Sequence, residues 1–187
     1  IGRDQEIWKY DPSKAGTQDE FSKFLNDVGT IGGIAVAANG DVYYSNMWDH
    51  RLTKVTVDSE GNKTSTKIID NNYGWASNNR EETWDETKGM YVAALGSNDA
   101  HLRYPGRLLF DDAKNTLYVT YAYREWCDYC NWGGPQVIDF NANTISDWQW
   151  LDDSYRNLMR SRGINQDPSW RGMDMDSDGN LFFAVPN

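Results

Sequence analysis

Cysteine, histidine and clustered basic residues are scarce in this chain, and each shortage excludes a class of function. Only two of the 187 residues are cysteine and two are histidine. The two cysteines cannot complete a four-ligand zinc site, and no histidine lies near them in the sequence. Lysine and arginine total 18 against 28 acidic residues, for a formal net charge of −10. Because nucleic-acid binding needs clustered Lys and Arg to neutralise phosphates, no nucleic-acid partner is expected.

Long apolar runs are also lacking. No run approaches the roughly 20 residues that cross a bilayer, so no membrane span is expected. The chain shows no secretory signal, yet it opens with Ile1 rather than Met, which we interpret as the start of a processed product or a fragment. The acidity is typical of a soluble surface outside the cell. We therefore expect an extracellular or cell-surface location.

One hairpin pattern is written three times, at residues 33–45, 107–120 and 172–184. Each copy is a short apolar run, a polar turn and a second run rich in aromatic and β-branched residues, which is typical of two paired strands. The first and third copies align without a gap, from Gly33 with Gly172 to Tyr44 with Phe183. Such recurrence predicts an all-β fold of stacked units that bury one another's faces, as in a β-propeller.

Residues 31–70 extend the first copy by two further strands and so predict one four-stranded antiparallel blade. This stretch resembles the NHL-type propeller repeat, in which a Gly-Ile-Ala-Val strand, an Asn-Gly or Asp-Gly turn, a Val-Tyr strand and an Arg-Leu/Ile-x-Lys-Val strand follow in that order. The resemblance implies a β-propeller of four-stranded blades. We expect no helix within this span and expect Ile34 and Val36 to face a neighbouring sheet.

The two ends of the chain both look like partial blades. About three blades are present in all, in the order half-blade 1–30, blade 31–70, insertion 71–105, blade 106–165 and half-blade 170–187. Because propellers typically have about 4 to 8 blades, we interpret the chain as part of a larger propeller whose other blades belong to a longer chain. The alternative, that the two half-blades join to close a small ring, stays open.

The two cysteines, Cys127 and Cys130, lie in one loop between predicted strands. Haem attachment is excluded because Asn131 stands where a c-type site needs His, and a thioredoxin-like pair would begin a helix. We predict a local disulfide, with free thiols as the alternative. The sequon at Asn62 predicts glycosylation in a turn, and together these features favour an oxidising compartment.

The cysteine loop is also the predicted ligand-binding surface. Sugars stack on flat aromatic rings while planar polar groups bond their hydroxyls, and this loop mixes both residue types. A second aromatic stretch lies in the insertion 71–105, and long insertions often carry function. The alternative is that the rings pack over a neighbouring blade. The residues assigned to ligand contact are Tyr123, Arg124, Trp126, Tyr129, Trp132, Trp75 and Trp84.

An acidic stretch, Asp174, Asp176 and Asp178, imitates the start of an EF-hand calcium loop. The imitation fails at Val185, where the bidentate Glu would stand, and the flanks have a strand pattern. The same residues also fit a plain hairpin turn, as in the first copy. No cofactor is assigned with certainty, and calcium is the one considered.

Catalytic patterns are few. His50 lies at a predicted blade edge, where a solvated or hydrogen-bonded polar role is usual. His101 to Tyr104 combines a base, a cation and a phenol, the residue types that propeller polysaccharide lyases use on uronates. Calcium-dependent lactonase-like propellers share the repeat type, but their ligands have no match here. The sequence therefore predicts a binding or assembly module, with glycans or other protein chains as partners, and a propeller lyase or lactonase-type hydrolase as the alternative.

Overall fold

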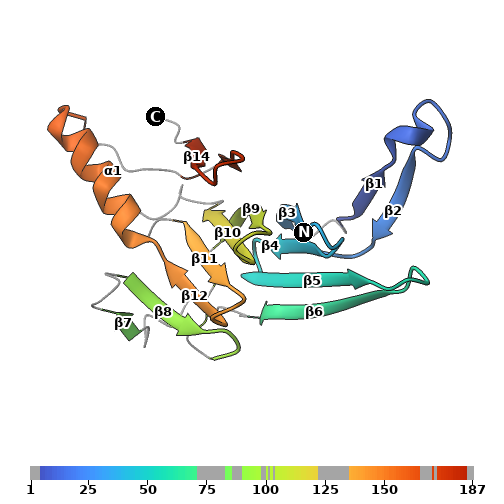
Figure 1. Cartoon of the computed structure of the whole chain (residues 1–187), viewed down its shortest axis with the longest axis horizontal. Helices are drawn as coiled ribbons and strands as arrows, with labels where there is room; N and C mark the ends of the chain where they lie inside the picture. The colour runs from blue at the N-terminus through green and yellow to red at the C-terminus, as the bar shows by residue number, and fades with distance from the viewer. Residues whose placement is uncertain are drawn as a thin grey trace. The chain divides into compact units, whose positions relative to one another are not determined.

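The structure, a computed structural model, describes residues 5–70, 83–85, 90–97, 100, 102, 104–121, 135–164, 170 and 172–184. The chain divides into two compact units, Ile1–Ile31 and Gly32–Asn187. The secondary-structure elements are labelled in Figure 1. In chain order they are β1 Ile7–Tyr10, the 3₁₀ helix η1 Pro12–Lys14, β2 Phe21–Leu25, β3 Ile31–Val36, β4 Val42–Asn46, β5 Arg51–Val57, β6 Lys63–Asp70, β7 Thr83–Asp85, β8 Met90–Ala94, β9 Pro105–Asp111, β10 Thr116–Tyr121, β11 Gln136–Asp139, β12 Thr144–Asp147, α1 Gln149–Ser161, β13 Gly172–Met175 and β14 Leu181–Ala184.

The first unit holds an antiparallel hairpin made of β1 and β2. Tyr10 and Phe21 face each other across it with ring centroids 5.0 Å apart. Lys23 lies over the Trp8 ring, 5.3 Å from its centroid, and its ammonium bonds Glu6 at 2.6 Å. These cross-strand pairs hold the hairpin together in the absence of a large apolar face.

Strands β3 to β6 form one four-stranded antiparallel sheet in the order β3-β4-β5-β6. No helix interrupts the span, so the predicted four-stranded antiparallel sheet over 31–70 is confirmed. Each strand pairs with the next one in the chain, as in a propeller blade. Figure 1 shows β5 and β6 as the two long strands at the outer side of this sheet.

The predicted orientation of β3 is wrong. Ile34 and Val36 are 43% and 61% exposed, while Ala35 on the opposite face is buried. The reason is the close approach of β3 to β9: a Cβ added at Gly33 would lie 2.3 Å from the carbonyl oxygen of Gly106. Only glycine and alanine fit between two strands this close, so the larger apolar residues take the other face.

The second large sheet has six antiparallel strands in the order β7-β8-β12-β11-β10-β9. Strands β9 to β12 are the four expected of a blade. The other two come from the insertion 71–105, where β8 pairs with β12 through Thr144 and Ala94. The insertion therefore widens this blade at its outer edge.

Residues 106–165, expected to form a blade, also contain helix α1, which leaves the end of β12 (Figure 1). Tyr155 on the helix contacts Trp170 edge-on, and Trp170 in turn contacts Phe183 of β14. Strands β13 and β14 form a separate antiparallel pair, and β13 packs beside β9. The aromatic chain thus connects α1 to β14.

The core of the second unit lies between the two large sheets. Tyr43 of β4 stacks on Phe110 at 5.0 Å and lies 5.5 Å from Phe140. Over the residues that the structure describes, the fold is all-β apart from α1 and η1, and it is built of antiparallel propeller-like blades. The buried residues of this core are Ala35, Ala37, Tyr43, Leu52, Ile69, Ala93, Ala100, Leu102, Leu108, Leu117, Val119, Ile138 and Ile145.

Candidate functional site

In the second unit, the long connections leave the strands at one end, which also carries the short β4–β5 turn, and the other short turns lie at the opposite end. Strand ends that pair with one another fix this arrangement: Arg51 with Asp70, Tyr121 with Pro105, and Gln136 with Asp147. At the end of the strands where the long connections depart, Ser45 of β4 joins the two sheets, because its hydroxyl donates to the carbonyl oxygen of Gly106 of β9 at 3.1 Å.

We call this end the long-connection rim. It comprises the β4–β5 turn at 47–50 and the strand ends from which the connections 71–104, 122–135 and 148–171 depart. At the opposite end, the turns 37–41, 58–62, 112–115, 140–143 and 176–180 are all short. Side chains are therefore available for recognition chiefly at the long-connection rim.

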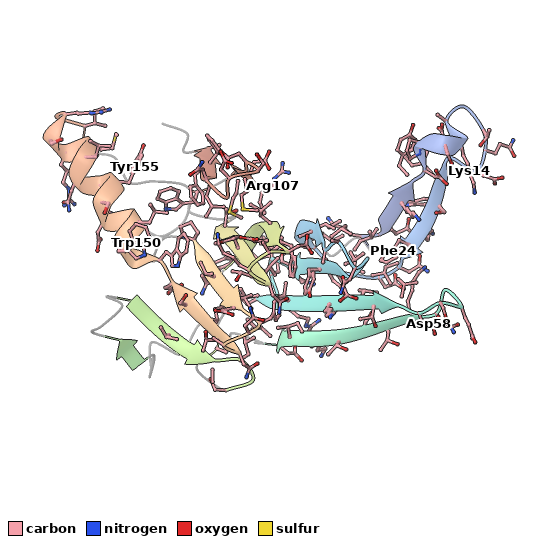
Figure 2. The ribbon with its side chains drawn as sticks, in the orientation of Figure 1. Lys14, Phe24, Asp58, Arg107, Trp150 and Tyr155 are labelled. Carbon is pink, nitrogen blue, oxygen red and sulfur yellow. The ribbon has the colours of Figure 1, made fainter. Side chains whose placement is uncertain are left out.

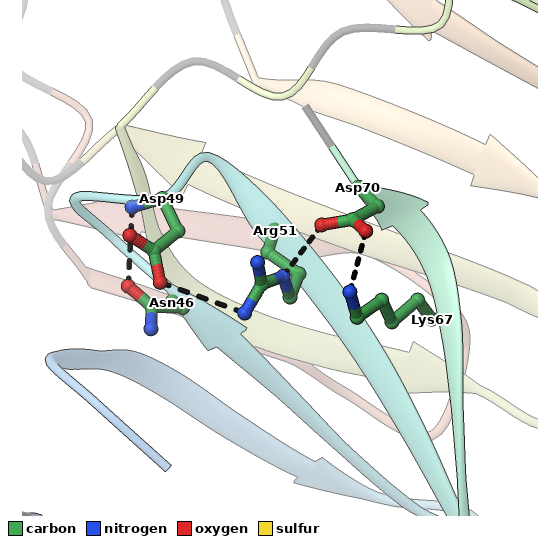
Figure 3. A network of polar contacts seen from close by, with 5 residues as sticks. All are labelled: Asn46, Asp49, Arg51, Lys67 and Asp70. Atoms are coloured by element: carbon green, nitrogen blue, oxygen red, sulfur yellow. Dashed lines mark hydrogen bonds and ion pairs between the residues drawn. The ribbon is translucent and has the colours of Figure 1, made fainter. Parts of the chain in front are cut away.

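An ion-pair network braces the rim on the first blade, as Figure 3 shows. Arg51 donates from Nε to Asp70 at 2.7 Å and lies 3.6 Å from Asp49. Lys67 bonds the second oxygen of Asp70 at 2.6 Å, and the N–H of Asp49 donates to Asn46 at 3.2 Å. The hydrogen bonds from Lys67 and then Arg51 lower the pKa of the Asp70 carboxyl. The network fixes the β4–β5 turn to the end of β6.

His50 is the last residue of the β4–β5 turn at the rim, and its side chain is buried, with the residue 8% exposed. Its Nδ1 is 3.1 Å from both the carbonyl oxygen of Leu102 and the N–H of Tyr104. It accepts from Tyr104 when the proton is on Nε2, and it donates to Leu102 in the other tautomer. Burial lowers the pKa of His50, so the ring is neutral at pH 7. The ring joins the β4–β5 turn to the segment before β9, which is a structural role.

Trp48 and Tyr104 form the aromatic part of the rim beside His50. The two rings meet edge-on with centroids 6.1 Å apart, and Tyr104 also contacts His50 at 4.4 Å. Trp48 nevertheless remains 53% exposed. A ring held in place by one edge while half its surface faces water is suited to stacking with a ligand.

A second aromatic group occupies the rim on the second blade. Tyr118 of β10 contacts Trp148 edge-on at 5.6 Å, and Trp148 contacts Trp150 at 5.5 Å. Trp150 lies in the first turn of α1, at the base of the helix in Figure 2, and is 45% exposed. The sequence reasoning assigned neither Trp48 nor Trp150 to ligand contact. The sequence signal that could have identified them is their position: Trp48 follows the second strand of its blade, and Trp150 follows the fourth strand of the next blade.

Most of the predicted ligand residues fall outside the described part of the chain. This holds for Tyr123, Arg124, Trp126, Tyr129, Trp132 and Trp75, and also for Cys127 and Cys130. Trp84 lies in β7, of which the backbone is described. The connections that carry these residues start and end at the long-connection rim. The predicted disulfide stays a prediction.

The acidic stretch at Asp176 has the geometry of a hairpin turn. One oxygen of Asp176 accepts from the N–H groups of Asp178 and Asn180, at 3.0 and 2.9 Å, and the other accepts from the Asn180 side chain at 2.9 Å. Gly179 completes the turn with a φ of +82°. Asp174 lies on β13, outside the turn.

The same turn occurs at 58–62, which carries the predicted glycosylation site. Asp58 bonds the N–H groups of Glu60 and Asn62, at 2.9 and 2.8 Å, and the Asn62 side chain donates to Asp58 at 2.9 Å. These bonds from Asn62 lower the pKa of Asp58, and the matching bonds from Asn180 lower that of Asp176. Because the two turns share the same hydrogen bonds, we interpret Asp58 and Asp176 as residues that stabilise the turns.

Metal ligands do not gather anywhere in the described ranges. No group of three His, Cys, Asp or Glu side chains lies close enough to hold an ion there. Calcium at Asp174, Asp176 and Asp178 stays a prediction that the turn geometry does not require. Among the helices described, none is long and apolar enough to cross a membrane.

The comparisons with known proteins find similar chains among solved structures. No family model matches the sequence, and no curated protein matches it. Among solved structures, the chain is similar to selenomethionine-substituted virginiamycin B lyase from Staphylococcus aureus, with 14% identity and a TM-score of 0.40. The match covers 98% of this chain and 39% of that one, so the chain spans well under half the length of that protein.

Proposed function

We propose that this chain is a binding module whose ligand surface is the long-connection rim, with carbohydrate as the ligand class. The observation that carries the proposal is the pair of half-exposed tryptophans, Trp48 and Trp150, each held by another aromatic ring. Ring edges packed against neighbours leave flat faces in fixed orientation, so little conformational entropy is lost when a pyranose stacks on them.

Polar groups beside Trp48 support recognition of hydroxyls. Asp49 and Arg51 form an ion pair whose side chains are 42% and 25% exposed, which leaves acceptors and donors next to the ring. Sugar-binding sites need this combination of planar polar groups and apolar faces. The residues proposed from the sequence, Trp126 and Trp132 in particular, belong to a connection that departs from the same rim.

A carbohydrate-binding role suits a secreted or cell-surface protein with NHL-type repeats, and we include that setting in the proposal. A disulfide between Cys127 and Cys130 and a glycan at Asn62 would fit it. Asn62 lies in an exposed turn at the opposite end of the blade from the rim, so a glycan there leaves the ligand surface open.

The competing function is a lyase or lactonase-type hydrolase. Such an enzyme needs His, Arg and carboxylate groups to converge on a substrate. His50, the histidine that the structure describes, is buried and its Nδ1 is engaged by backbone groups on both sides. This geometry favours the binding module.

The test is glycan binding by tryptophan variants. Glycans that bind the chain are selected on an array of soluble oligosaccharides, and their affinity is measured by isothermal titration calorimetry. Half of a tryptophan side chain offers roughly 100 Å² of apolar surface, which is worth about 2.5 kcal/mol when covered. Trp48→Ala or Trp150→Ala should therefore weaken binding by about 1–3 kcal/mol and leave the melting temperature nearly unchanged.

The matched control is Trp8→Ala. Trp8 is 52% exposed, as Trp48 is, but it belongs to the hairpin of the first unit. Its replacement should leave glycan affinity unchanged. The proposal fails if no glycan binds the intact chain, or if Trp8→Ala lowers affinity as much as the rim variants do.

A further inference from the structure

One ring nitrogen of His50 has two backbone neighbours of opposite kind. Its Nδ1 lies 3.1 Å from the carbonyl oxygen of Leu102 and 3.1 Å from the amide nitrogen of Tyr104. A carbonyl oxygen needs a donor and an N–H group needs an acceptor, so one ring nitrogen satisfies only one of the two at a time. Whether Nδ1 carries a proton therefore decides which of these residues the β4–β5 turn binds.

Protonation of His50 exchanges one of these hydrogen bonds for the other. In the neutral ring with its proton on Nε2, Nδ1 accepts from the N–H of Tyr104. The charged ring carries a proton on both nitrogens, so Nδ1 then donates to Leu102 and no longer accepts from Tyr104. A partly buried N–H that loses its bond is unfavourable, so we expect the backbone at Tyr104 to rearrange.

The backbone of Tyr104 is strained in a way that favours such a rearrangement. Its φ is +34°, a conformation that residues with a side chain rarely adopt. Strain of this kind persists only where the surroundings enforce it, and the bond from the Tyr104 N–H to His50 is one of the contacts that do so. When that bond breaks, the backbone of Tyr104 can relax toward a negative φ.

Ring contacts carry a shift of Tyr104 to the ligand surface. The Tyr104 ring lies against the His50 ring, with centroids 4.4 Å apart, and meets the Trp48 ring edge-on at 6.1 Å. Trp48 is 53% exposed, so its orientation depends on the neighbours at this edge. Trp150 contacts Trp148 instead, which makes it an internal reference on the same rim.

The surroundings of His50 hold the ring neutral at pH 7 and allow it to gain a proton in mild acid. Burial lowers its pKa, while the hydrogen bond to Leu102 and the negative charge of Asp49 raise it in part. The proton is therefore taken up below the ordinary histidine pKa of about 6.5. The charged and titratable groups described on the elements around the ring, several of them drawn in Figure 3, are Asp49, Arg51, Lys67, Asp70 and Tyr104.

We propose that His50 is a positioning residue that makes ligand binding at Trp48 depend on pH. The ligand is the glycan of the proposed function, on which this inference rests. While His50 is neutral, it holds Tyr104, and Tyr104 holds Trp48 in the orientation that stacks on a sugar. When His50 is protonated, Tyr104 is released and Trp48 loses its support. The rim therefore binds glycan at neutral pH and releases it in mild acid.

The loss of affinity in acid has a lower and an upper bound. An anchor residue contributes about fivefold or more to affinity, so binding should weaken by at least about that factor once His50 is protonated. Protonation acts through Trp48, so the wild type in acid should bind no more weakly than Trp48→Ala does at pH 7. The coupling is reciprocal, so bound glycan should lower the pKa of His50 further.

The first experiment needs no ligand. The 187-residue chain is labelled with 15N-tyrosine and 5-fluorotryptophan, and the NMR signals are assigned by their loss in Tyr104→Phe, Trp48→Phe and Trp150→Phe. Between pH 7 and 5, the amide proton of Tyr104 should move upfield as its hydrogen bond is lost. The fluorine signal of Trp48 should shift with the same midpoint as the His50 ring, and that of Trp150 should not follow it.

Histidine variants separate His50 from the other titratable groups. In His50→Asn, the side-chain oxygen takes the place of Nδ1 and accepts from Tyr104 at every pH, and Asn tolerates the φ of +50° at this position. The Tyr104 and Trp48 signals should then be independent of pH. His101→Asn is the matched control, because it removes the other histidine of the chain, and it should titrate as the wild type does.

The second experiment measures glycan affinity by isothermal titration calorimetry at pH 7 and 5. Acid should weaken binding by the wild type, by His101→Asn and by Trp150→Ala. It should leave the affinity of His50→Asn unchanged, because the residue at 50 no longer titrates. It should also leave that of Trp48→Ala unchanged, because the ring through which the proton acts is gone.

Three results would overturn the proposal. One is a His50 ring that stays neutral down to pH 5, and another is a ring that titrates while the Tyr104 and Trp48 signals stay in place. The third is an affinity that falls equally in the wild type and in His50→Asn, since another group then causes the loss. If no glycan binds at either pH, the proposed function fails and the coupling to a ligand fails with it, whereas the ligand-free spectra still decide whether His50 positions Trp48.

Discussion

Replacing Gly33 with alanine should separate the two blades, because the added methyl group would meet backbone and not a side chain that can move. The Cβ would lie 2.3 Å from the carbonyl oxygen of Gly106 and 2.8 Å from backbone atoms of Arg107 and Leu108. Ordinary contact begins at 3.4 Å, so β3 and β9 would have to move apart by about 1.1 Å.

The magnitude follows from that displacement. A gap of about 0.5–1 Å forfeits roughly a quarter to a half of the dispersion energy across the contact, and overpacking typically costs about 1–3 kcal/mol. Alanine recovers about 0.4–1 kcal/mol by restricting the unfolded chain. The free energy of unfolding should fall by about 2 kcal/mol, and at about 2–4 °C per kcal/mol for a chain of this size the melting temperature should fall by about 4–8 °C.

Urea denaturation followed by tryptophan fluorescence measures this difference. The comparison is Gly40→Ala, at a glycine with open space around it and a φ of +88°. Its cost should be about 1–2 kcal/mol and come from backbone strain alone. A second site separates the two causes: Gly32→Ala, whose Cβ would lie 1.9 Å from the Pro105 carbonyl oxygen, should be at least as harmful as Gly33→Ala. If Gly33→Ala unfolds within about 0.5 kcal/mol of the wild type, β3 and β9 do not approach as described.

Two further predictions concern titration and calcium. Burial lowers the pKa of His50 in the fold, so the unfolded chain takes up this proton first as the pH falls below about 6.5. The free energy of unfolding should therefore fall by at most about 1.4 kcal/mol per pH unit from this group, and urea titrations between pH 7 and 5 should show this slope. His50→Asn, chosen because Asn tolerates the φ of +50°, should remove the slope. Asp58→Ala and Asp176→Ala should each lower the free energy of unfolding by about 1–2 kcal/mol, because the hydrogen bonds of the turn are lost. Calcium should leave the melting temperatures unaffected. A calcium-dependent rise in the melting temperature of the wild type that Asp176→Ala abolishes would instead establish a metal site.

The sequence predicted the first blade well because its information is local. Alternating strands separated by turns with Asn, Asp and Gly determine which strands pair, and each pairs with its neighbour in the chain. Which face of β3 is buried was not predictable in this way. Both faces alternate regularly, and the choice depends on how closely β9 approaches Gly33, which is a tertiary property.

The sequence analysis did not predict the β8–β12 pairing or helix α1, and the reasons differ. The pairing of β8 with β12 joins residues about 50 positions apart, and nothing in either short strand specifies the partner. Helix α1 was more accessible, since Trp148, Leu151 and Tyr155 recur at helical spacing after the last strand of the blade. That spacing was overlooked because the propeller pattern favoured strands throughout.

The sequence indicated that two long connections could share one rim, but it did not show which residues gather there, and the ligand contacts predicted on those connections stay predictions. The length of the connections indicated where recognition residues would lie, and three long connections do leave one rim. The roles of Trp48 and His50 depend on packing. The two residues are only two positions apart, yet the Trp48 ring faces solvent and the His50 ring is buried.

The division of the strands into an end with short turns and an end with long connections has a consequence for how such a chain can change. Tight turns such as 58–62 and 176–180 hold their strands in register by specific hydrogen bonds, so an insertion there would disturb a blade. At the other end, lengthening a connection adds only a small, logarithmic entropic term. The connections at 122–135 and 148–171 can therefore be exchanged while the sheets that support them stay the same, whereas an exchange of 71–104 would also replace β7 and β8 of the second sheet.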